Sequence, residues 1–504
     1  MIDRPRTLTW IGLLASTLQR HGSFIKSTVS MTSHGVQPGA GEKIERGILP
    51  LAKSNLAGGY LHSTYFWGVF VGLGFFDAVQ SRVQSFRQTG RNSKAMSQGT
   101  IQSLLEDEYH DLCKSMKEKL ALTSTVSRLI GTSMKIRETL VHKTPAKLAK
   151  GAALLDKLQQ ERRWFREGVV NKVTIGMDEL LHLDRLMRFS TAAYGYKTLH
   201  FLGLIPSWDT CWNNREGIQH LTGVGADDIK VQAEASEVYR PGHFLCVDHA
   251  AKQVVLSIRG TIRLQDLWTD LVCHPAKFSV ADTVTNEELD GFAHEGFLTA
   301  ARVLAFDLHD EVAAALNENP SYSLAVTGHS LGGSVATLLA LIWTQIPLFM
   351  SRGVHAYSFA SPSCLSYDLA RSTFVKKHAT SLIVGDDVVC KLNIGTTIDL
   401  LQACDALAAD DLDLAKKKRI WKRFREKASL TDNKLFPGGT VYHIPLKKRY
   451  NDDCFEVHSA EEVDPAKATN EIILTPKMFQ VHLPLNYMNA LRMQPLLQKE
   501  NVQN

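Results

Sequence analysis

The sequence SYSLAVTGHSLGGSVATLLALIW, residues 321–343, joins a short apolar run to a long apolar segment through the pentapeptide GHSLG. The first run has the length and composition of a buried strand, and residues 334–343 are good helix formers. A serine in a G-x-S-x-G sequence between a strand and a helix is typical of a nucleophile on a tight turn. Gly328 and Gly332, on either side, let the neighbouring backbone pack closely. The stretch predicts Ser330 as a candidate nucleophile.

Three further segments have a similar pattern: each is a short apolar run that ends in glycine or small polar residues. They read KQVVLSIRG (252–260), GVHAYSFASP (353–362) and TSLIVGDD (380–387). The segments between them are long enough for helical crossovers, which parallel strands require. The pattern predicts an α/β fold with a mostly parallel sheet covered by helices, and places the chemistry at the carboxyl ends of its strands.

An oxyanion hole needs two donors close to the nucleophile. One is expected from the backbone N–H of Leu331, at the start of the helix after Ser330. The other is expected from the loop after residues 254–258, where Thr261 follows Arg259 and Gly260. Thr261 could donate its N–H and orient itself through its hydroxyl.

A nucleophilic serine also needs a base and an acid that orients it. Asp386 and Asp387 follow a strand and are both candidates for the acid. His443, His458 and His482 lie after them in the chain. His443 falls within a predicted strand and His458 in an acidic loop. His482 follows a strand-like segment (EIILTP, 471–476) and precedes a helix, which favours it as the base.

Several separated motifs resemble the class 3 lipases, and most closely the sn-1-specific diacylglycerol lipase branch. They are MRFSTAAYGY (187–196), SEVYRPGHFLCVDHAAKQVVLSIRGTIRLQDLWTDL (236–271), GHSLGGSVA (328–336), ASP (360–362), GTVYHI (439–444) and HLPLNY (482–487). The resemblance covers about residues 180–495 and implies an α/β-hydrolase fold. It also implies Ser330 as nucleophile, Asp387 as acid, His482 as base, and Thr261 with Leu331 as oxyanion hole. One departure is Cys390-Lys391, where the family has proline and arginine.

The resemblance implies a serine lipase that cuts diacylglycerol at sn-1 to give a monoacylglycerol and a fatty acid. A phospholipase A1 or galactolipase is an alternative, because the triad does not encode the head group. A catalytically inactive membrane-bound interaction protein is another. No cofactor is required for this chemistry, and calcium is suggested by the resemblance alone. Residues 274–293 occupy the position of the family's lid, and residues 294–297 (HEGF) are expected to give structural support.

The charge of the chain is concentrated in one segment. Residues 416–427 (KKKRIWKRFREK) hold eight basic residues and one acidic residue, although the net charge of the whole chain is only +5. Such local basicity argues against a general nucleic-acid binder. Acidic residues precede this segment, so we expect a basic insertion at about 400–428 that forms one helix over about 400–427. Basic residues around Ile420, Trp421 and Phe424 suit docking on anionic lipid, and a solvated insertion or a nuclear-targeting run are the alternatives.

The first part of the chain carries features of a different kind. We expect a tail or targeting segment at 1–50, an apolar membrane segment at 51–80 and an accessory helical region at 81–180, before the lipase domain at 181–495. Residues 54–76 contain no charged side chain, and 23 such residues are enough to span a bilayer. The eight cysteines show no zinc or disulfide pattern. We therefore expect a membrane-associated, intracellular protein, with organelle or secretory targeting left open.

Overall fold

The computed structural model describes residues 48–49, 145–163, 175–205, 213–234, 236–237, 239–261, 275–282, 285, 287–409, 413–427, 434–448, 455–475 and 478–503. The apolar segment 54–76 and residues 81–144 of the predicted helical region lie outside the described residues, so the predictions for them stay predictions. Among the residues that are described, no helix is both long enough and apolar enough to cross a bilayer.

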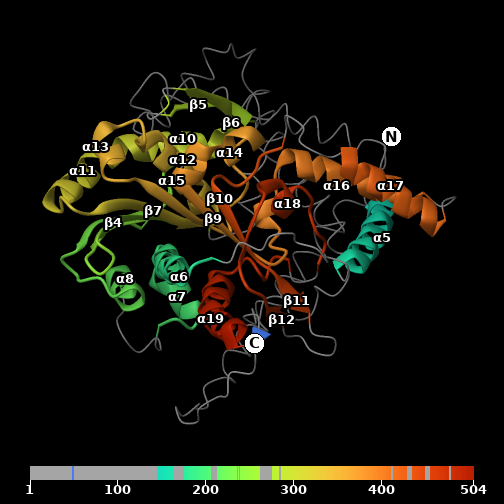
Figure 1. The fold of residues 1–504 in the computed structure, drawn as a ribbon, viewed down its shortest axis with the longest axis horizontal. Coiled ribbons are helices and arrows are strands. Elements are labelled where there is room, and N and C mark those ends of the chain that lie inside the picture. The colour runs from blue at the N-terminus through green and yellow to red at the C-terminus, as the bar shows by residue number, and fades with distance from the viewer. Residues whose placement is uncertain are drawn as a thin grey trace, which may run out of the picture. The chain divides into compact units, whose positions relative to one another are not determined.

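A central sheet of eight strands organises the fold (Figure 1), in the spatial order β13-β10-β9-β8-β7-β4-β3-β2. Its strands are β2 (Ile229–Ala233), β3 (His243–Asp248), β4 (Gln253–Ile258), β7 (Ser323–His329), β8 (His355–Phe359), β9 (Ala379–Val384), β10 (Thr440–Ile444) and β13 (Glu461–Val463). The pairs from β4 to β10 are parallel, and β2, β3 and β13 extend the sheet in antiparallel pairs. The prediction of a mostly parallel sheet is confirmed.

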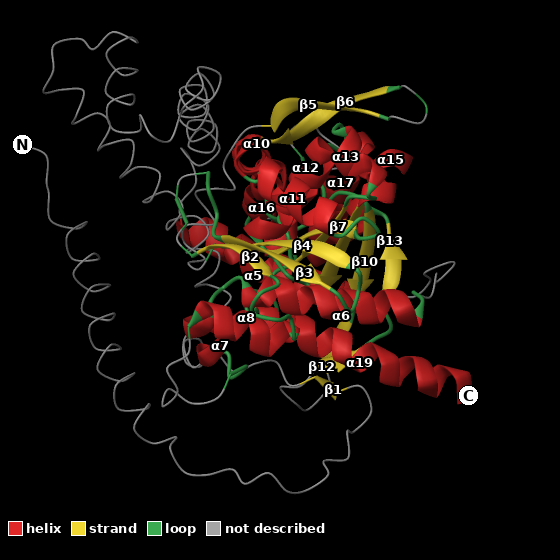
Figure 2. Cartoon of the chain, turned by 90° about the vertical axis from the view of Figure 1, so that its left-hand side faces the viewer, coloured by secondary structure: helices red, strands yellow, loops and turns green. Residues whose placement is uncertain are grey.

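Helices cover both faces of this sheet (Figure 2). They are α5 (Pro145–Arg163), α6 (Met177–Ala192), α7 (Tyr196–Phe201), α8 (Asn214–Thr222), α10 (Glu295–Asp307), α11 (His309–Glu318), α12 (Leu331–Trp343), α13 (Pro347–Ser351), α14 (Tyr367–Arg371), α15 (Thr373–His378), α16 (Ile394–Leu407), α17 (Leu414–Lys427), α18 (Pro465–Thr469) and α19 (Pro484–Gln503). The helices α10 and α12 lie on one face, and α6 and α19 on the other. Every residue of β9 is buried, because helices on both faces exclude water from it.

The range predicted for the lid forms an antiparallel hairpin of β5 (Pro275–Ala281) and β6 (Glu288–His294). Near its base, the Phe292 N–H donates to Ser366 Oγ at 3.0 Å, and the Ser366 N–H donates to the Phe292 carbonyl at 2.8 Å. Near its tip, the side chain of Gln345 bonds the N–H and the carbonyl of Ala281, at 3.3 and 3.1 Å. The hairpin is thus fastened to the body at both ends, and its role as a lid stays a prediction.

The basic insertion is two helices, α16 and α17, and the expectation of one helix over about 400–427 is wrong. The physical reason lies at Asp413, whose carboxylate accepts the N–H of Lys416 at 2.7 Å. A side chain that satisfies a free backbone donor in this way begins a new helix.

The segment expected to be a strand before His482 is not one either: residues 471–475 have no strand partner. A side chain takes the place of that partner. Gln159 of α5 donates to the Ile472 carbonyl and accepts from the Leu474 N–H, each at 2.9 Å. Helix α5 therefore supports the chain that leads to His482. It packs tightly on α16 because Gly151 lies against Cys404, where an added Cβ would be 1.8 Å from the carbonyl oxygen.

A small three-stranded sheet completes the structure, made of β1 (Ile48–Leu49), β11 (Leu446–Lys448) and β12 (Phe455–Val457). A 3-10 turn, η1 (Val389–Lys391), follows the loop after β9.

Candidate active site

The sharp turn predicted at Ser330 lies between the carboxyl end of β7 and the start of α12. Ser330 has φ 59° and ψ −133°, a backbone conformation that L-residues rarely adopt. Such strain persists only where surrounding contacts impose it, and it costs on the order of 1–3 kcal/mol. Here the Ser330 N–H donates to the Phe359 carbonyl of β8 at 2.8 Å. The turn is held by the sheet itself.

Close packing explains the two glycines of the turn. A Cβ on Gly328 would lie 2.3 Å from the carbonyl carbon of Gly332, and a Cβ on Gly332 would lie 2.1 Å from the carbonyl oxygen of Ile258. Both distances are far below van der Waals contact with backbone atoms that cannot move aside. Glycine at these positions lets β7, α12 and the end of β4 meet.

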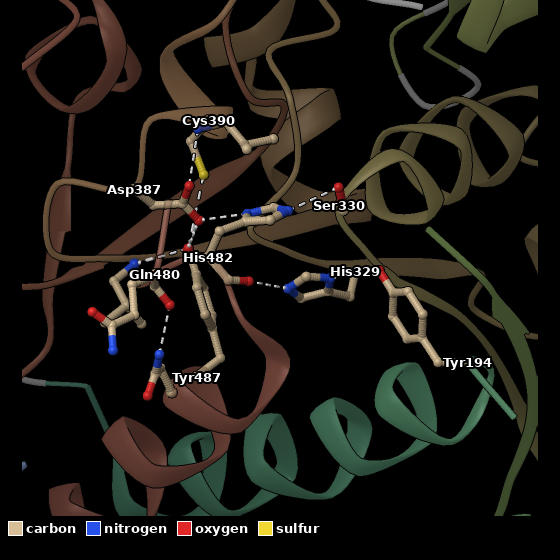
Figure 3. A network of polar contacts seen from close by, with 11 residues as sticks. Tyr194, His329, Ser330, Asp387, Cys390, Gln480, His482 and Tyr487 are labelled. Carbon is tan, nitrogen blue, oxygen red and sulfur yellow. Dashed lines mark hydrogen bonds and ion pairs between the residues drawn. The ribbon is translucent and has the colours of Figure 1, made fainter. Parts of the chain in front are cut away.

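The structure brings Ser330, His482 and Asp387 into one hydrogen-bonded chain (Figure 3). The His482 Nδ1 lies 2.9 Å from Asp387 Oδ2, and its Nε2 lies 3.0 Å from Ser330 Oγ. A carboxylate only accepts, so Nδ1 carries the hydrogen and the neutral imidazole offers Nε2 to the serine hydroxyl. All three residues are buried. This arrangement can take a proton from the hydroxyl and stabilise the imidazolium that results.

Two further donors hold the carboxylate of Asp387. The Val389 N–H donates to Oδ1 at 2.9 Å, and the Tyr487 hydroxyl donates to Oδ2 at 2.7 Å. The Tyr487 oxygen in turn accepts the N–H of Val384 at 3.2 Å. Burial raises the pKa of Tyr487, and the Asp387 charge raises it further, so the phenol stays a donor. The Val389 N–H, the Tyr487 hydroxyl and His482 Nδ1 together fix the carboxylate.

The other candidates for acid and base lie elsewhere. Asp386 is half-buried in the turn after β9, whereas Asp387 is fully buried and contacts His482. His443 lies in β10, where its Nε2 is 2.9 Å from the Gly385 carbonyl. His458 lies in a loop after β12. Of the histidines weighed, His482 is the one in contact with Ser330.

The loop predicted to complete the oxyanion hole lies against Ser330. An added Cβ on Gly260 would be 2.9 Å from the Ser330 Cβ and 2.5 Å from the His329 carbonyl oxygen. Thr261 follows directly and is half-buried. Leu331 is the first residue of α12, where backbone N–H groups point out of the helix end. Leu331 and the residue before Thr261 therefore lie beside the serine, and the oxyanion role of the Leu331 and Thr261 N–H groups stays a prediction.

Cys390 is the departure from the family pattern, and it lies beside the acid. Its sulfur is 3.8 Å from the Tyr487 oxygen, and burial raises the pKa of its thiol. The thiol is a buried, weak hydrogen-bonding group beside Tyr487 and Asp387.

The residues 294–297 support the fold, as expected. The side chain of His294 accepts the Phe297 N–H at the start of α10, and its ring stacks on Phe297.

Three residues of the site's surroundings escaped the sequence interpretation: Tyr194, His329 and Tyr487. Each has small or apolar residues nearby, where an aromatic ring or a histidine resembles ordinary core. The only available signal was that each falls within a motif quoted for the resemblance. Among the described residues, no group of three or more His, Cys, Asp or Glu side chains gathers as a metal site.

The chain is similar in sequence to known lipases. Residues 255–396 match the family described as lipase (class 3), a range that includes Thr261, Ser330 and Asp387. Diacylglycerol lipase-beta of Mus musculus is 30% identical over 292 residues, which cover 51% of this chain and 41% of that protein. Secreted mono- and diacylglycerol lipase 1 of Fusarium solani is 34% identical over 99 residues, 20% of this chain and 28% of that protein.

Among solved structures, a triacylglyceride lipase of Rhizomucor miehei matches with a TM-score of 0.38 at 17% identity, over 62% of this chain and 96% of that chain. This chain spans less than half the length of the two sequence relatives named above.

Proposed function

Because this chain belongs to the class 3 lipase family, we propose that it hydrolyses an acyl ester of a glycerolipid by serine catalysis. The observation that carries the proposal is the contact of Ser330 Oγ with His482 Nε2 at 3.0 Å, on an imidazole whose Nδ1 faces a carboxylate. A hydroxyl so paired becomes a nucleophile when the imidazole takes its proton.

The reaction proceeds in two halves. Ser330 Oγ attacks the ester carbonyl while His482 takes its proton, and the N–H groups of Leu331 and Thr261 stabilise the tetrahedral oxyanion. His482, now an imidazolium facing Asp387, gives the proton to the leaving glycerol oxygen. A water molecule then attacks the acyl-serine, with His482 as base, and the fatty acid leaves.

For the substrate we propose a diacylglycerol cut at sn-1, which gives a 2-monoacylglycerol and a fatty acid. Two observations support a glycerolipid of this class: relatives named diacylglycerol lipase match 51–54% of the chain, and a secreted relative is named for mono- and diacylglycerol. The sn-1 position rests on the resemblance of the motifs alone.

The test compares the purified protein with its Ser330→Ala variant in mixed micelles that contain diacylglycerol labelled at sn-1 or at sn-2. Phosphatidylcholine and a galactosyl diacylglycerol, labelled in the same way, complete the set. Serine-dependent release of the sn-1 label from diacylglycerol is the expected result. Release mainly from a polar lipid would make the protein a phospholipase A1 or a galactolipase. No release by the wild-type protein would leave an inactive interaction protein.

We also propose that the exposed face of α17 docks on an anionic lipid surface. Among the side chains of α17 that the structure describes, the exposed basic ones are Lys416, Lys418, Arg419, Lys422 and Arg423. Trp421, one of the aromatic anchors expected from the sequence, is not on this face, and the side chain of Phe424 lies outside the described residues. The Trp421 ring packs on the core, and its Nε1 donates to Glu471 Oε1 at 3.2 Å. Contact would therefore be electrostatic, without an inserted tryptophan.

Charge reversal tests this surface. Each basic residue near an anionic bilayer contributes about 1 kcal/mol, so the variant Arg419→Glu/Arg423→Glu is expected to bind phosphatidylserine-containing vesicles about tenfold more weakly or worse. The matched control, Lys197→Glu/Lys377→Glu, changes the net charge equally at exposed sites outside α17. Equal binding by the two variants would contradict the proposal, as would binding that does not weaken with added salt.

A further inference from the structure

A second hydrogen-bonded chain runs beside the first and meets it at His482 (Figure 3). His329 Nε2 lies 2.8 Å from the backbone carbonyl oxygen of His482, and the Tyr194 hydroxyl lies 2.8 Å from His329 Nδ1. Both side chains are buried, with His329 1% exposed and Tyr194 8% exposed. Three segments far apart in the chain are thereby joined: the end of α6, the turn before α12 and the loop before α19.

The partners fix where the hydrogens are. A carbonyl oxygen only accepts, so His329 Nε2 carries a hydrogen and donates it to His482. Burial lowers the pKa of His329 well below its usual range, and the neighbouring His482 lowers it further, so the ring is neutral. Its Nδ1 is then an acceptor, and the Tyr194 hydroxyl donates to it. Every polar atom of the pair has a defined role.

The Tyr194 hydroxyl also contacts the oxyanion loop. An added Cβ on Gly260 would lie 2.3 Å from the Tyr194 oxygen. The loop that carries Thr261 therefore packs directly against the hydroxyl that orients His329. A change at Tyr194 acts on this loop and on the His482 backbone together.

The nucleophile segment and the base loop are thus linked twice. Ser330 bonds the imidazole of His482, and its neighbour His329 bonds the backbone of the same residue. His482 lies in a turn rather than in a helix or strand, so no ladder of backbone bonds fixes its position. The His329 bond supplies that constraint and is independent of the bond that the reaction breaks.

We propose that Tyr194 and His329 are positioning residues, which hold the His482 backbone and the Gly260–Thr261 loop at the separation that proton transfer requires. The proposal rests on the proposed function of Ser330 and His482. A misplacement of about 1 Å in a catalytic group can lower the rate about 100-fold. Loss of the pair should therefore lower kcat and leave KM nearly unchanged, because neither residue is expected to touch the substrate.

Three substitutions separate the two hydrogen bonds. In His329→Gln, the side-chain amide nitrogen can reach the place of Nε2 and still donate to His482. In His329→Asn, the side chain ends near the place of Nδ1 and loses that donor. Tyr194→Phe removes one hydroxyl and keeps the ring. The control is Tyr357→Phe, the same change in β8, where the ring contacts His182 and His355 instead.

The measurements are kcat, KM and the rate constant for labelling of Ser330 by a fluorophosphonate, with each value normalised to the labelled fraction at completion. We expect labelling and kcat to fall about 100-fold in His329→Asn and about tenfold in His329→Gln and Tyr194→Phe, with no change in Tyr357→Phe. The normalisation counts only folded sites, so a loss of stability alone would leave the rate constants unchanged.

Wild-type rate constants in Tyr194→Phe and His329→Asn would overturn the positioning role. Equal losses in His329→Gln and His329→Asn would also overturn it, because the donor to His482 would then be irrelevant. If His329→Asn fails to fold, the comparison of Tyr194→Phe with Tyr357→Phe decides the matter. A wild-type protein in which Ser330 is not labelled would instead contradict the proposed function itself.

Discussion

The carboxyl and amino ends of the parallel strands each hold a histidine between an oxygen acceptor and a hydroxyl group. At the carboxyl end, His482 Nδ1 lies 2.9 Å from the Asp387 carboxylate and Nε2 lies 3.0 Å from Ser330 Oγ. The lengths of these two bonds would suit any imidazole that is held by two polar neighbours.

At the amino end, His355 opens β8 and makes nearly the same pair of contacts. Its Nδ1 lies 3.0 Å from the Lys377 carbonyl oxygen and its Nε2 lies 2.9 Å from Thr380 Oγ1. Thr380 belongs to β9, the strand whose other end leads to Asp387. One strand therefore contributes to both arrangements.

The difference lies in charge and backbone, and not in distance. A carboxylate stabilises the imidazolium that forms when His482 takes a proton, whereas the neutral carbonyl beside His355 does so only weakly. Burial lowers the pKa of His355 to about 4, so it stays neutral and structural. The Ser330 hydroxyl is held on a strained turn, and Thr380 sits in a regular strand. Hydrogen-bond geometry alone would not distinguish a reactive site from a packed one.

The largest difference is expected between the hydroxyl groups of Ser330 and Thr380. Ser330→Ala should lower esterase activity about 10⁴- to 10⁶-fold and abolish fluorophosphonate labelling, because Ser330 Oγ is the hydroxyl that contacts His482 Nε2. Thr380→Ala should leave both within about twofold, since its imidazole has no carboxylate partner. The measurement is hydrolysis of a short-chain ester together with mass-spectrometric mapping of the labelled residue. A label on Thr380 would remove the distinction between the carboxyl and amino ends of the parallel strands.

The next largest effect is expected at Asp387, the carboxylate that accepts from His482 Nδ1. Asp387→Asn keeps the shape but removes the charge and favours the wrong tautomer of His482, so kcat should fall about 10⁴-fold. Asp386→Asn serves as the control, because Asp386 is half-buried in the preceding turn, and it should cost less than about threefold. If the two variants lose activity equally, Asp387 does not act through His482. The activity of both variants is measured over a pH range.

Much of this site could be predicted from local sequence. The runs that became β4, β7, β8 and β9 are short, apolar and rich in β-branched residues, and the glycines of the turn at Ser330 have no substitute. Chain order then narrowed the base to three histidines, local context favoured His482, and the resemblance implied Asp387, although the choice between Asp386 and Asp387 needed the structure. Side-chain direction decided it, and a sequence does not contain that information for a turn.

Two of the errors share a different cause, which is tertiary contact. Residues 471–475 are apolar enough for a strand, yet the amide of Gln159 satisfies their backbone from 313 and 315 residues away. Trp421 has the spacing of a lipid anchor, yet Glu471 binds its indole. In both cases a distant polar side chain overrides a local pattern, and no local pattern signals such a partner.

A smaller effect tests how the carboxylate of Asp387, at the carboxyl ends of the parallel strands, is held in place. Tyr487→Phe removes the donor at 2.7 Å from Asp387 Oδ2. It leaves the Val389 N–H and the His482 Nδ1–H in place. A hydrogen bond to a charged group contributes about 1.5–3 kcal/mol, part of which the remaining donors can replace. We therefore expect kcat to fall about tenfold. Tyr442→Phe, in β10, is the control, and unchanged activity in both variants would show that Tyr487 is not needed to orient the acid.

The last effect spares activity and appears only in stability. The folded-state pKa of His355 is about 4, below the usual value of 6.5, because burial disfavours its charged form. Between these values the unfolded chain binds more protons than the folded one, so the free energy of unfolding must fall as the pH drops from 6.5 towards 4. His355 should contribute about 1–3 kcal/mol to this loss.

His355→Asn keeps a donor for the Lys377 carbonyl and cannot titrate. Its unfolding free energy, measured by denaturant titration from pH 7 to pH 4, should depend less on pH than that of the wild type by this amount. Part of the slope should remain, because burial also lowers the pKa of His182 and His378. An identical slope in the variant would mean that His355 takes up its proton in the folded protein as readily as in the unfolded chain. The amino end of the sheet would then hold an imidazolium without a carboxylate, and the contrast with His482 would have to rest on the strained turn at Ser330.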